Sequence, residues 1–172
     1  MGLTERELCP KWYALAVKHQ HERSAGEAFQ SKGFETLVPL YRTTRRWSDR
    51  VRETDLPLFA GYVFCRFEYH DRVALLKTPG VWRIVGFGGT PTPIEDDEIS
   101  AIQTMVESKV PIGPWPYLKP GDRVKVERGP LRGLEGTILR EKDIQRLVIS
   151  VELLRRSIAA EISPDAVIPC RA

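Results

Sequence analysis

The alternation of side chains after Gly61 predicts a β-strand over residues 62–67. One set of alternate positions is apolar and is expected in the core: Val63, Cys65 and Phe67. The other set places two aromatic residues beside an arginine: Tyr62, Phe64 and Arg66. With Phe59 just upstream, this second face is either a hydrophobic docking surface or the second face of a sheet buried on both sides. The pattern leaves both interpretations open.

The same reasoning predicts the other elements of the first 110 residues. In chain order they are a strand over 12–18, a helix over 20–32, a strand over 34–41, a polar hairpin over 42–55, a short helix over 72–77, a strand over 81–87 and a helix over 96–108. Gly33 follows the first helix where a C-terminal glycine is common, and Pro39 indicates a strand edge or a bulge. The last helix has an apolar stripe of Ile99, Ile102 and Val106.

Residues 110–120 contain four prolines and a glycine, which excludes a helix or a central strand and indicates a linker. Short strands with glycine turns follow, over 124–126, 137–140, 147–153, 157–162 and 165–168. Residues 153–162 also have helical spacing, but the β-branched residues before them favour a strand. The sequence thus predicts an α+β protein. An N-terminal antiparallel sheet flanked by helices spans 9–109, a proline-rich linker spans 110–119, and a small all-β barrel spans 120–172.

Composition adds few constraints to this organisation. With 28% charged and 42% hydrophobic residues, the chain is typical of globular proteins, and its net charge of +3 does not by itself indicate nucleic-acid binding. We expect no membrane span, because no apolar run approaches 20 residues. The three cysteines are isolated, so neither a zinc site nor a disulfide framework is expected, and the cytoplasm is the expected compartment.

The residues that resemble catalytic or metal-binding groups have simpler structural explanations. The acidic run 95–98 stands at a predicted helix start, where carboxylates offset the helix dipole. The histidines have no nucleophile nearby in the sequence, and the glycines at 86, 88 and 89 lack the Lys-Ser/Thr pair of a phosphate-binding loop. We therefore expect a binding protein without enzymatic activity, metal or cofactor.

Several motifs in their order and spacing carry a resemblance to a known family. They are Trp12-Tyr13, the LFAGYVF stretch at 58–64, Gly80-Val81 followed by VGFGG at 85–89, and PGDRVKV at 120–126 followed by GPL at 129–131 and GLEG at 133–136. The chain resembles the NusG family of transcription elongation factors over nearly its whole length. Its first domain resembles the family's N-terminal (NGN) domain, and its tail resembles an SH3-like KOW domain.

The resemblance implies that the first domain docks on bacterial RNA polymerase, at the clamp helices of its largest subunit. The matching positions are aromatic: Phe59, Tyr62, Phe64 and Phe87. It also suggests contact with the non-template DNA strand through basic residues: Lys18, Arg45, Arg46 and Arg50. A solvated charged face is the alternative for these residues. The polar threonine motif of specialised antiterminators does not carry over, because Asp71-Arg72-Val73 stands in that region.

In the family, the KOW domain recruits the termination factor Rho or a small-subunit ribosomal protein through its glycine-turn loop. The corresponding residues here are Leu131 and Leu134, and Leu134 replaces an aromatic residue that is common in the family. An exposed leucine would dock, whereas a buried one would plug the barrel. This departure favours a specialised, RfaH-like paralogue that acts in antitermination or pausing, expected as a monomer. A ribosome- or RNA-binding KOW module without polymerase binding is the alternative function.

Overall fold

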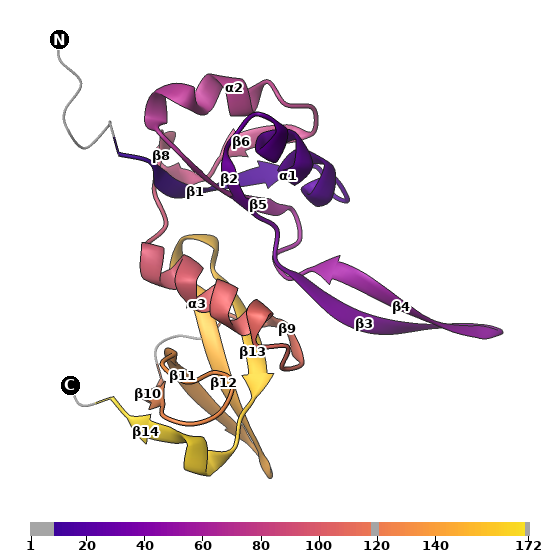
Figure 1. The fold of residues 1–172 in the computed structure, drawn as a ribbon, viewed down its shortest axis with the longest axis vertical. Coiled ribbons are helices and arrows are strands. Elements are labelled where there is room, and N and C mark those ends of the chain that lie inside the picture. The colour runs from indigo at the N-terminus through magenta and orange to yellow at the C-terminus, as the bar shows by residue number, and fades with distance from the viewer. Residues whose placement is uncertain (1–8, 118–120, 171–172) are drawn as a thin grey trace. The chain divides into compact units, whose positions relative to one another are not determined.

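The computed structural model describes residues 9–117 and 121–170. The described residues form two compact units, one of residues 9–38 and 59–96 and the other of residues 39–58, 97–117 and 121–170. Both contain antiparallel strands and helices or helical turns, so the expected α+β class is confirmed (Figure 1). Within the described ranges, no helix is long and apolar enough to cross a membrane.

The first unit is built on a four-stranded antiparallel sheet in the order β2-β5-β1-β6. Its elements are β1 (Lys11–Val17), α1 (Glu22–Ser31), β2 (Glu35–Leu37), β5 (Tyr62–Phe67), the 3₁₀ turn η2 (Tyr69–Asp71), α2 (Arg72–Leu76), β6 (Val81–Ile84), β7 (Gly86–Phe87) and β8 (Thr90–Pro91). The predicted strand after Gly61 is therefore a central strand, paired with β1 on one side and β2 on the other.

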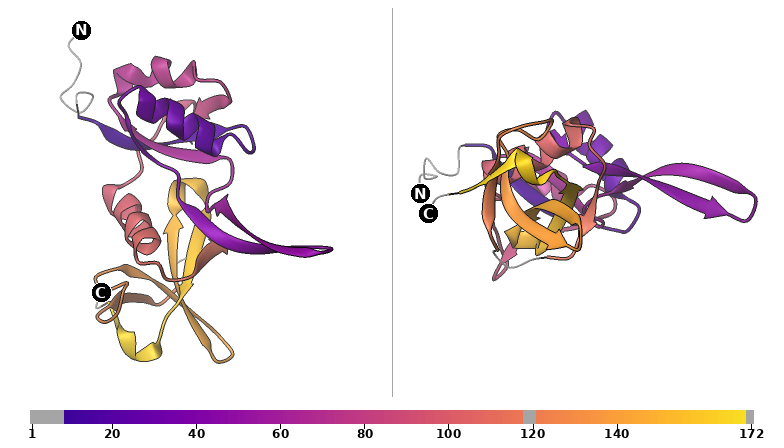
Figure 2. Two further views of the ribbon diagram at one scale, coloured as in Figure 1. Left: turned by 45° about the vertical axis from the view of Figure 1, so that its right-hand side comes forward. Right: turned by 90° about the horizontal axis from the view of Figure 1, so that it is seen from below.

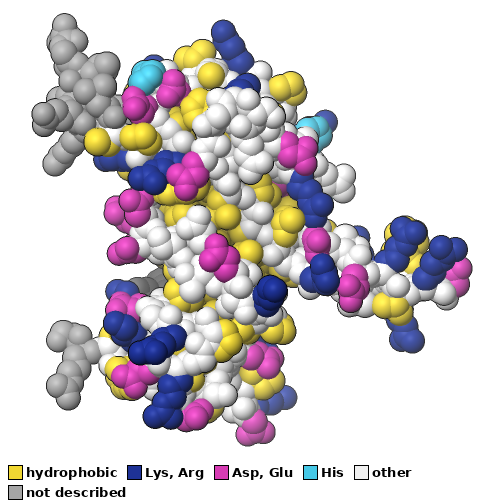
Figure 3. Space-filling view, viewed as in Figure 1, with side chains coloured by type: hydrophobic (Ala, Val, Ile, Leu, Met, Phe, Trp, Pro, Cys, Tyr) yellow, Lys and Arg dark blue, Asp and Glu magenta, His cyan; other side chains and the backbone are white. Residues whose placement is uncertain are grey.

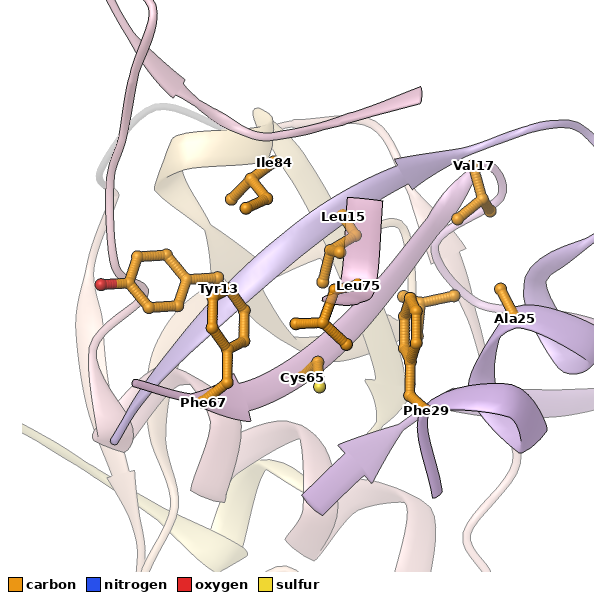
Figure 4. Packing of buried hydrophobic residues seen from close by; sticks show 10 residues of the cluster. Tyr13, Leu15, Val17, Ala25, Phe29, Cys65, Phe67, Leu75 and Ile84 are labelled. Carbon is orange, nitrogen blue, oxygen red and sulfur yellow. The ribbon is translucent and has the colours of Figure 1, made fainter. Parts of the chain in front are cut away.

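One face of this sheet carries the core of the unit. Val63, Cys65 and Phe67 are all buried there, as the alternation predicted. They pack with residues of β1, β6 and two helices: Tyr13, Leu15, Val17, Ala25, Phe29, Leu75 and Ile84 (Figure 4). Because α1 and α2 both contribute to this cluster, both helices cover the same face of the sheet (Figure 2).

A buried carboxylate holds the turn that leads into β5. Gly61 has a φ of +84°, a conformation that favours glycine. Its backbone N–H donates to Oε1 of Glu22 over 2.8 Å, and its carbonyl accepts from the N–H of Val17 over 2.9 Å. Glu22 is buried and lies in the first turn of α1, where the helix dipole favours a negative charge. One side chain thus links the start of the helix to the start of the central strand.

The second unit contains a two-stranded ribbon and a six-stranded antiparallel sheet in the order β14-β10-β11-β12-β13-β9. Its elements are β3 (Leu40–Trp47), β4 (Arg50–Pro57), α3 (Asp96–Glu107), β9 (Ile112–Trp115), β10 (Arg123–Val126), β11 (Glu135–Glu141), β12 (Ile144–Val151), η3 (Glu152–Leu154), β13 (Arg156–Glu161), η4 (Pro164–Ala166) and β14 (Val167–Pro169). The strand alternative for residues 153–162 is confirmed over β13, which pairs with β12 and β9.

Prolines and close backbone contacts divide elements that the pattern predicted as continuous. The strand expected over 34–41 stops at Leu37, and a new strand begins at Leu40 after Pro39, which has no N–H to donate. The strand expected over 81–87 is interrupted at Val85, and β7 then pairs with β8. A Cβ on Gly86 would lie 1.9 Å from the carbonyl oxygen of Thr90, so only glycine fits this tight hairpin.

Two further differences concern residues 96–115. Met105 rather than Val106 completes the buried stripe of α3 with Ile99 and Ile102. Residues 112–115, expected in the linker, form β9 at the edge of the sheet. Pro114 is compatible with this position, because an edge strand leaves one row of backbone groups without a partner strand. The end of the expected linker, residues 118–120, lies outside the described residues.

We predict that Glu22→Ala lowers the free energy of unfolding by about 2 kcal/mol, because it leaves the Gly61 N–H without its charged acceptor. Urea denaturation followed by circular dichroism measures this change. Glu27→Ala is the matched control, since Glu27 lies on the same helix and is exposed. Equal stabilities of the two variants would show that the buried carboxylate does not hold the turn.

Candidate functional site

The aromatic side of β5 is largely buried. Phe59 and Phe64 are 1% and 0% exposed, and their rings meet edge to face with centroids 5.2 Å apart. Phe64 is flanked by Ala14 of β1 and Leu37 of β2, its partners across the two strand pairs. The exposure that we expected of a docking face is therefore not found at these two positions. A partner that touched Phe59 or Phe64 would require a change in the structure around them.

The other two aromatic candidates are accessible to different degrees. Tyr62 is half-buried at the start of β5, beside Ala16 of β1. Phe87 is 71% exposed in the β7–β8 hairpin, and its N–H donates to Oγ1 of Thr92 over 3.3 Å. Sequence reasoning missed Trp82, which is 70% exposed on the edge strand β6. Phe87 thus needs no rearrangement to meet a partner.

The basic candidates divide between the two units. Lys18 is exposed directly after β1, in the first unit. Arg45, Arg46 and Arg50 are exposed on the β3–β4 ribbon, in the second unit. Figure 3 shows Lys and Arg side chains gathered around the end of this ribbon. The ribbon therefore concentrates positive charge on an element that pairs with no other strand in the described structure.

The register of the ribbon separates the three arginines. Arg45 lies opposite Arg52, and Arg50 lies opposite Trp47. Because side chains alternate between the faces of a strand, these four share one face, whereas Arg46 lies on the other. Sequence reasoning did not select Trp47 or Arg52. The sequence signal for them was the two-residue turn Ser48-Asp49. A turn of that length places Trp47 opposite Arg50 and so sets the register of the two strands.

The glycine-turn loop of the tail holds its leucines inside. Leu131 and Leu134 are both buried, and Leu134 closes the turn by donating its N–H to the carbonyl of Leu131 over 3.1 Å. The carbonyl of Leu134 in turn accepts from the N–H of Val126 in β10 over 2.8 Å. Of the two arrangements considered for Leu134, the buried one is present. Arg132, between the two leucines, is exposed.

Cys65, the buried cysteine, has the chemistry of a structural residue. Burial raises the pKa of the Cys65 thiol to about 12; the hydroxyl of Thr36, 3.8 Å from the sulfur, lowers it in part and the charge of Glu35 raises it slightly. A thiol with so high a pKa stays protonated at neutral pH and is a poor nucleophile. Among the described residues, no three His, Cys, Asp or Glu side chains group closely enough to hold a metal ion.

The two units are thus an α+β unit with aromatic side chains on its sheet and a second unit with a six-stranded antiparallel sheet. A family model described as "Transcription termination factor nusG" matches residues 10–103. The transcription termination/antitermination protein NusG of Pasteurella multocida is 31% identical over 93% of this chain and 95% of its own length. The protein of the same name from Escherichia coli K12 is 31% identical over 74% of each chain.

The chain therefore belongs to the NusG family, whose members are transcription factors and not enzymes. A solved structure of Thermotoga maritima NusG, described by its domain interaction, covers 96% of this chain and 99% of its own with a TM-score of 0.57. At 22% identity this likeness concerns the fold alone. The expected family, the elongation- and termination-factor class and the absence of enzymatic activity are confirmed by these comparisons, and proteins of this family act with the transcription machinery.

We predict that iodoacetamide at pH 8 modifies Cys9, which is exposed, and leaves Cys65 unmodified in the folded protein. Folding raises the pKa of the Cys65 thiol from 9.0 to about 12, so the reactive thiolate appears only when the pH rises toward that value or the chain unfolds. Peptide mass spectrometry measures the modification of each cysteine. Rapid labelling of Cys65 at pH 8 without urea would show that the core around β5 opens readily.

Proposed function

We infer that the protein binds bacterial RNA polymerase through the aromatic side of its first unit and modulates pausing, termination or antitermination. Membership of the NusG family, over a match that includes this unit, is the observation that carries the inference. The proposed contact is with the clamp helices of the largest subunit. Phe87 is exposed and Tyr62 is half-buried, so these two side chains are the proposed contacts with the partner. Phe59 and Phe64 are buried and support the sheet that carries Tyr62. Large aromatic residues dominate the energy of protein interfaces.

The exposed basic residues supply a second proposed contact, with nucleic acid near the polymerase. Arg45, Arg46 and Arg50 lie on the β3–β4 ribbon, whose strands contain no buried residue. Lys18 is a further candidate in the first unit. Positive side chains bind the phosphate backbone whatever its sequence. The non-template DNA strand is the proposed partner for these residues.

The tail is the proposed site for a second protein partner, either Rho or a small-subunit ribosomal protein. Because Leu131 and Leu134 are buried, their proposed part is to hold the glycine-turn loop in shape. Exposed side chains of the same loop, such as Arg132, would then make the contact. We propose that the protein acts on transcription in the cytoplasm and that its oligomeric state is a monomer.

A ribosome- or RNA-binding KOW module without polymerase binding receives less support. The family match covers residues 10–103, which include the aromatic unit that such a module would not need. The region that resembles a KOW domain also has a net charge of only +2, from 10 basic and 8 acidic side chains over residues 121–172. Dedicated RNA-binding domains usually carry a stronger positive charge.

We predict that Phe87→Ala weakens binding of the full chain to purified bacterial RNA polymerase by about 2 kcal/mol, or roughly 30-fold. The reason is that the ring of Phe87, exposed in the free protein, would be buried at the centre of the interface. Truncation to alanine removes most of that buried contact area. Tyr62→Ala should weaken binding in the same direction, and thermal melting establishes whether that variant stays folded. Biolayer interferometry with immobilised polymerase measures the affinities.

Trp82→Ala is the matched control, because Trp82 is as exposed as Phe87 and lies on β6, the strand that precedes β7 in the chain. The proposal requires its affinity to stay close to that of the unaltered protein. If the full chain does not bind polymerase at all, or if all three variants bind like the unaltered protein, the polymerase part of the proposal is wrong.

A further inference from the structure

The segment that follows α3 pairs with the sheet of the tail. α3 ends at Glu107, and β9 begins at Ile112. β9 lies antiparallel to β13, with Ile112 opposite Ala160 and Trp115 opposite Ser157 (Figure 1). Because β9 is the last strand of this sheet, β13 would be the edge strand without it. The unpaired backbone groups of an edge strand are a template for another strand. β9 therefore covers an edge that would otherwise be open.

The backbone of β9 gives this pairing little support. The strand consists of Ile112, Gly113, Pro114 and Trp115, and glycine and proline are depleted in strands. Pro114 also has no N–H to donate to β13. The pairing of β9 with β13 ends at Trp115, whereas β12 pairs with β13 over the whole range from Arg146 to Val151. Main-chain pairing thus holds β9 less firmly than it holds β12.

A side-chain contact adds to this weak pairing. The guanidinium carbon of Arg146 lies over the indole of Trp115, 4.7 Å from the ring centroid. Arg146 belongs to β12, so the contact reaches across β13, which lies between β12 and β9. Trp115 is half-buried, and the attraction of a cation to the face of a tryptophan ring is stronger where water is partly excluded. This contact is therefore a main attachment of β9 to the sheet.

Arg146 is held in place by residues outside β9. Its guanidinium lies 3.0 Å from a carboxylate oxygen of Glu141 on β11 and 3.6 Å from one of Glu161 on β13. Only 19% of the Arg146 side chain is exposed. Because neither carboxylate belongs to β9, both ion pairs can persist when β9 is detached. The binding surface for Trp115 then stays formed, and β9 can return to it.

α3 has a separate contact with the tail. Oε1 of Glu98 accepts a hydrogen bond from the N–H of Glu152 over 3.1 Å, at the start of η3. With β9 in place, α3 is attached near its N-terminus through Glu98 and after its C-terminus through β9. Without β9, only the exposed hydrogen bond remains, and water competes for both of its groups. Detachment of β9 would therefore loosen α3 from the tail as well.

We propose that β9 is a releasable latch. It leaves and rejoins β13 while the rest of the sheet stays folded, and the contact of Trp115 with Arg146 sets the fraction of time for which it is closed. The closed latch covers the edge of β13 and ties α3 to the tail, and the open latch frees both. The latch thereby controls access to the tail. This regulatory role rests on the partner proposed above for the tail, whereas the opening of the latch does not.

Amide hydrogen exchange followed by NMR tests the proposal on the full chain. In an antiparallel sheet, the N–H groups along one strand point alternately to its two neighbours. The amides of β13 that face β9 should exchange about 10-fold faster than those that face β12, because opening of the latch breaks only the first set of hydrogen bonds. Equally slow exchange of both sets, at the rate set by global unfolding, would overturn the proposal.

Trp115→Ala should raise the exchange of the set that faces β9 by about a further 10-fold, because it removes the contact that favours the closed latch. Trp115→Phe should keep part of the protection, since a phenyl ring also attracts a cation. Trp47→Ala is the matched control, because Trp47 is 67% exposed on a ribbon that does not pair with this sheet, and it should change neither set. An equal rise of both sets in Trp115→Ala would indicate a general loss of stability and overturn the proposal.

A double-mutant cycle tests whether Arg146 is the partner that matters. Arg146→Ala should raise the exchange of the set that faces β9, and the variant that combines it with Trp115→Ala should exchange no faster than Arg146→Ala alone, because both changes remove the same contact. Arg140→Ala, at an exposed position on the neighbouring strand β11, should have no effect. Independent, additive effects of the two substitutions would show that this contact does not set the opening of β9.

Failure of the latch and failure of the proposed function can be told apart. The exchange measurements contain no partner, so a latch that does not open leaves the proposed partners of the tail and of the first unit untouched. Conversely, a tail that binds neither proposed partner removes the regulatory role, while the exchange pattern of β13 still reports whether β9 opens.

Discussion

The pairing of β1 with β5 is the interaction on which the first unit depends. It sets Leu15 beside Val63 and Ala14 beside Phe64, and so decides which side chains of the central strand face the helices and which face away. A shift of one residue would exchange the two faces. The hydrogen bonds of Gly61 to Glu22 and Val17 fix where the strand begins and thereby keep this register. The position of every aromatic candidate on β5 follows from this arrangement.

The β3–β4 ribbon is under a different constraint. It pairs with no third strand in the described structure, and its outer half is exposed on both faces. Its side chains therefore contribute little to a core, and a two-stranded ribbon alone is only marginally stable. Unpaired charge and an exposed indole on such an element are more informative about binding than the same residues would be on a packed sheet. The two candidate surfaces of the protein thus have different physical origins, one from a sheet face and one from a free hairpin.

Most of the fold could be predicted from the sequence, because alternation and helical spacing are local signals. The core residues Val63, Cys65 and Phe67, the helices, and the strands of the tail followed from them. Local patterns cannot show which distant residues cover a given face of a strand or loop. The burial of Phe59 and Phe64, and of Leu131 and Leu134, depends on residues distant in sequence. The separation of Arg45 from Arg46 depended on the register across a two-residue turn, and β9 depended on a strand partner more than 40 residues away (Gly113 pairs with Ala159).

Site-specific photocross-linking tests whether the protein binds RNA polymerase through its first unit. Phe87 is replaced by p-benzoylphenylalanine in the full chain, which is mixed with purified bacterial RNA polymerase and irradiated. We predict a cross-link to the clamp helices of the largest subunit, and excess unaltered protein should suppress it. The same photoreactive residue at Trp82, equally exposed on β6, is predicted to give little product. Cross-linking from position 82 but not from position 87, or no cross-link to the largest subunit from either, would show that the protein does not dock on polymerase through Phe87.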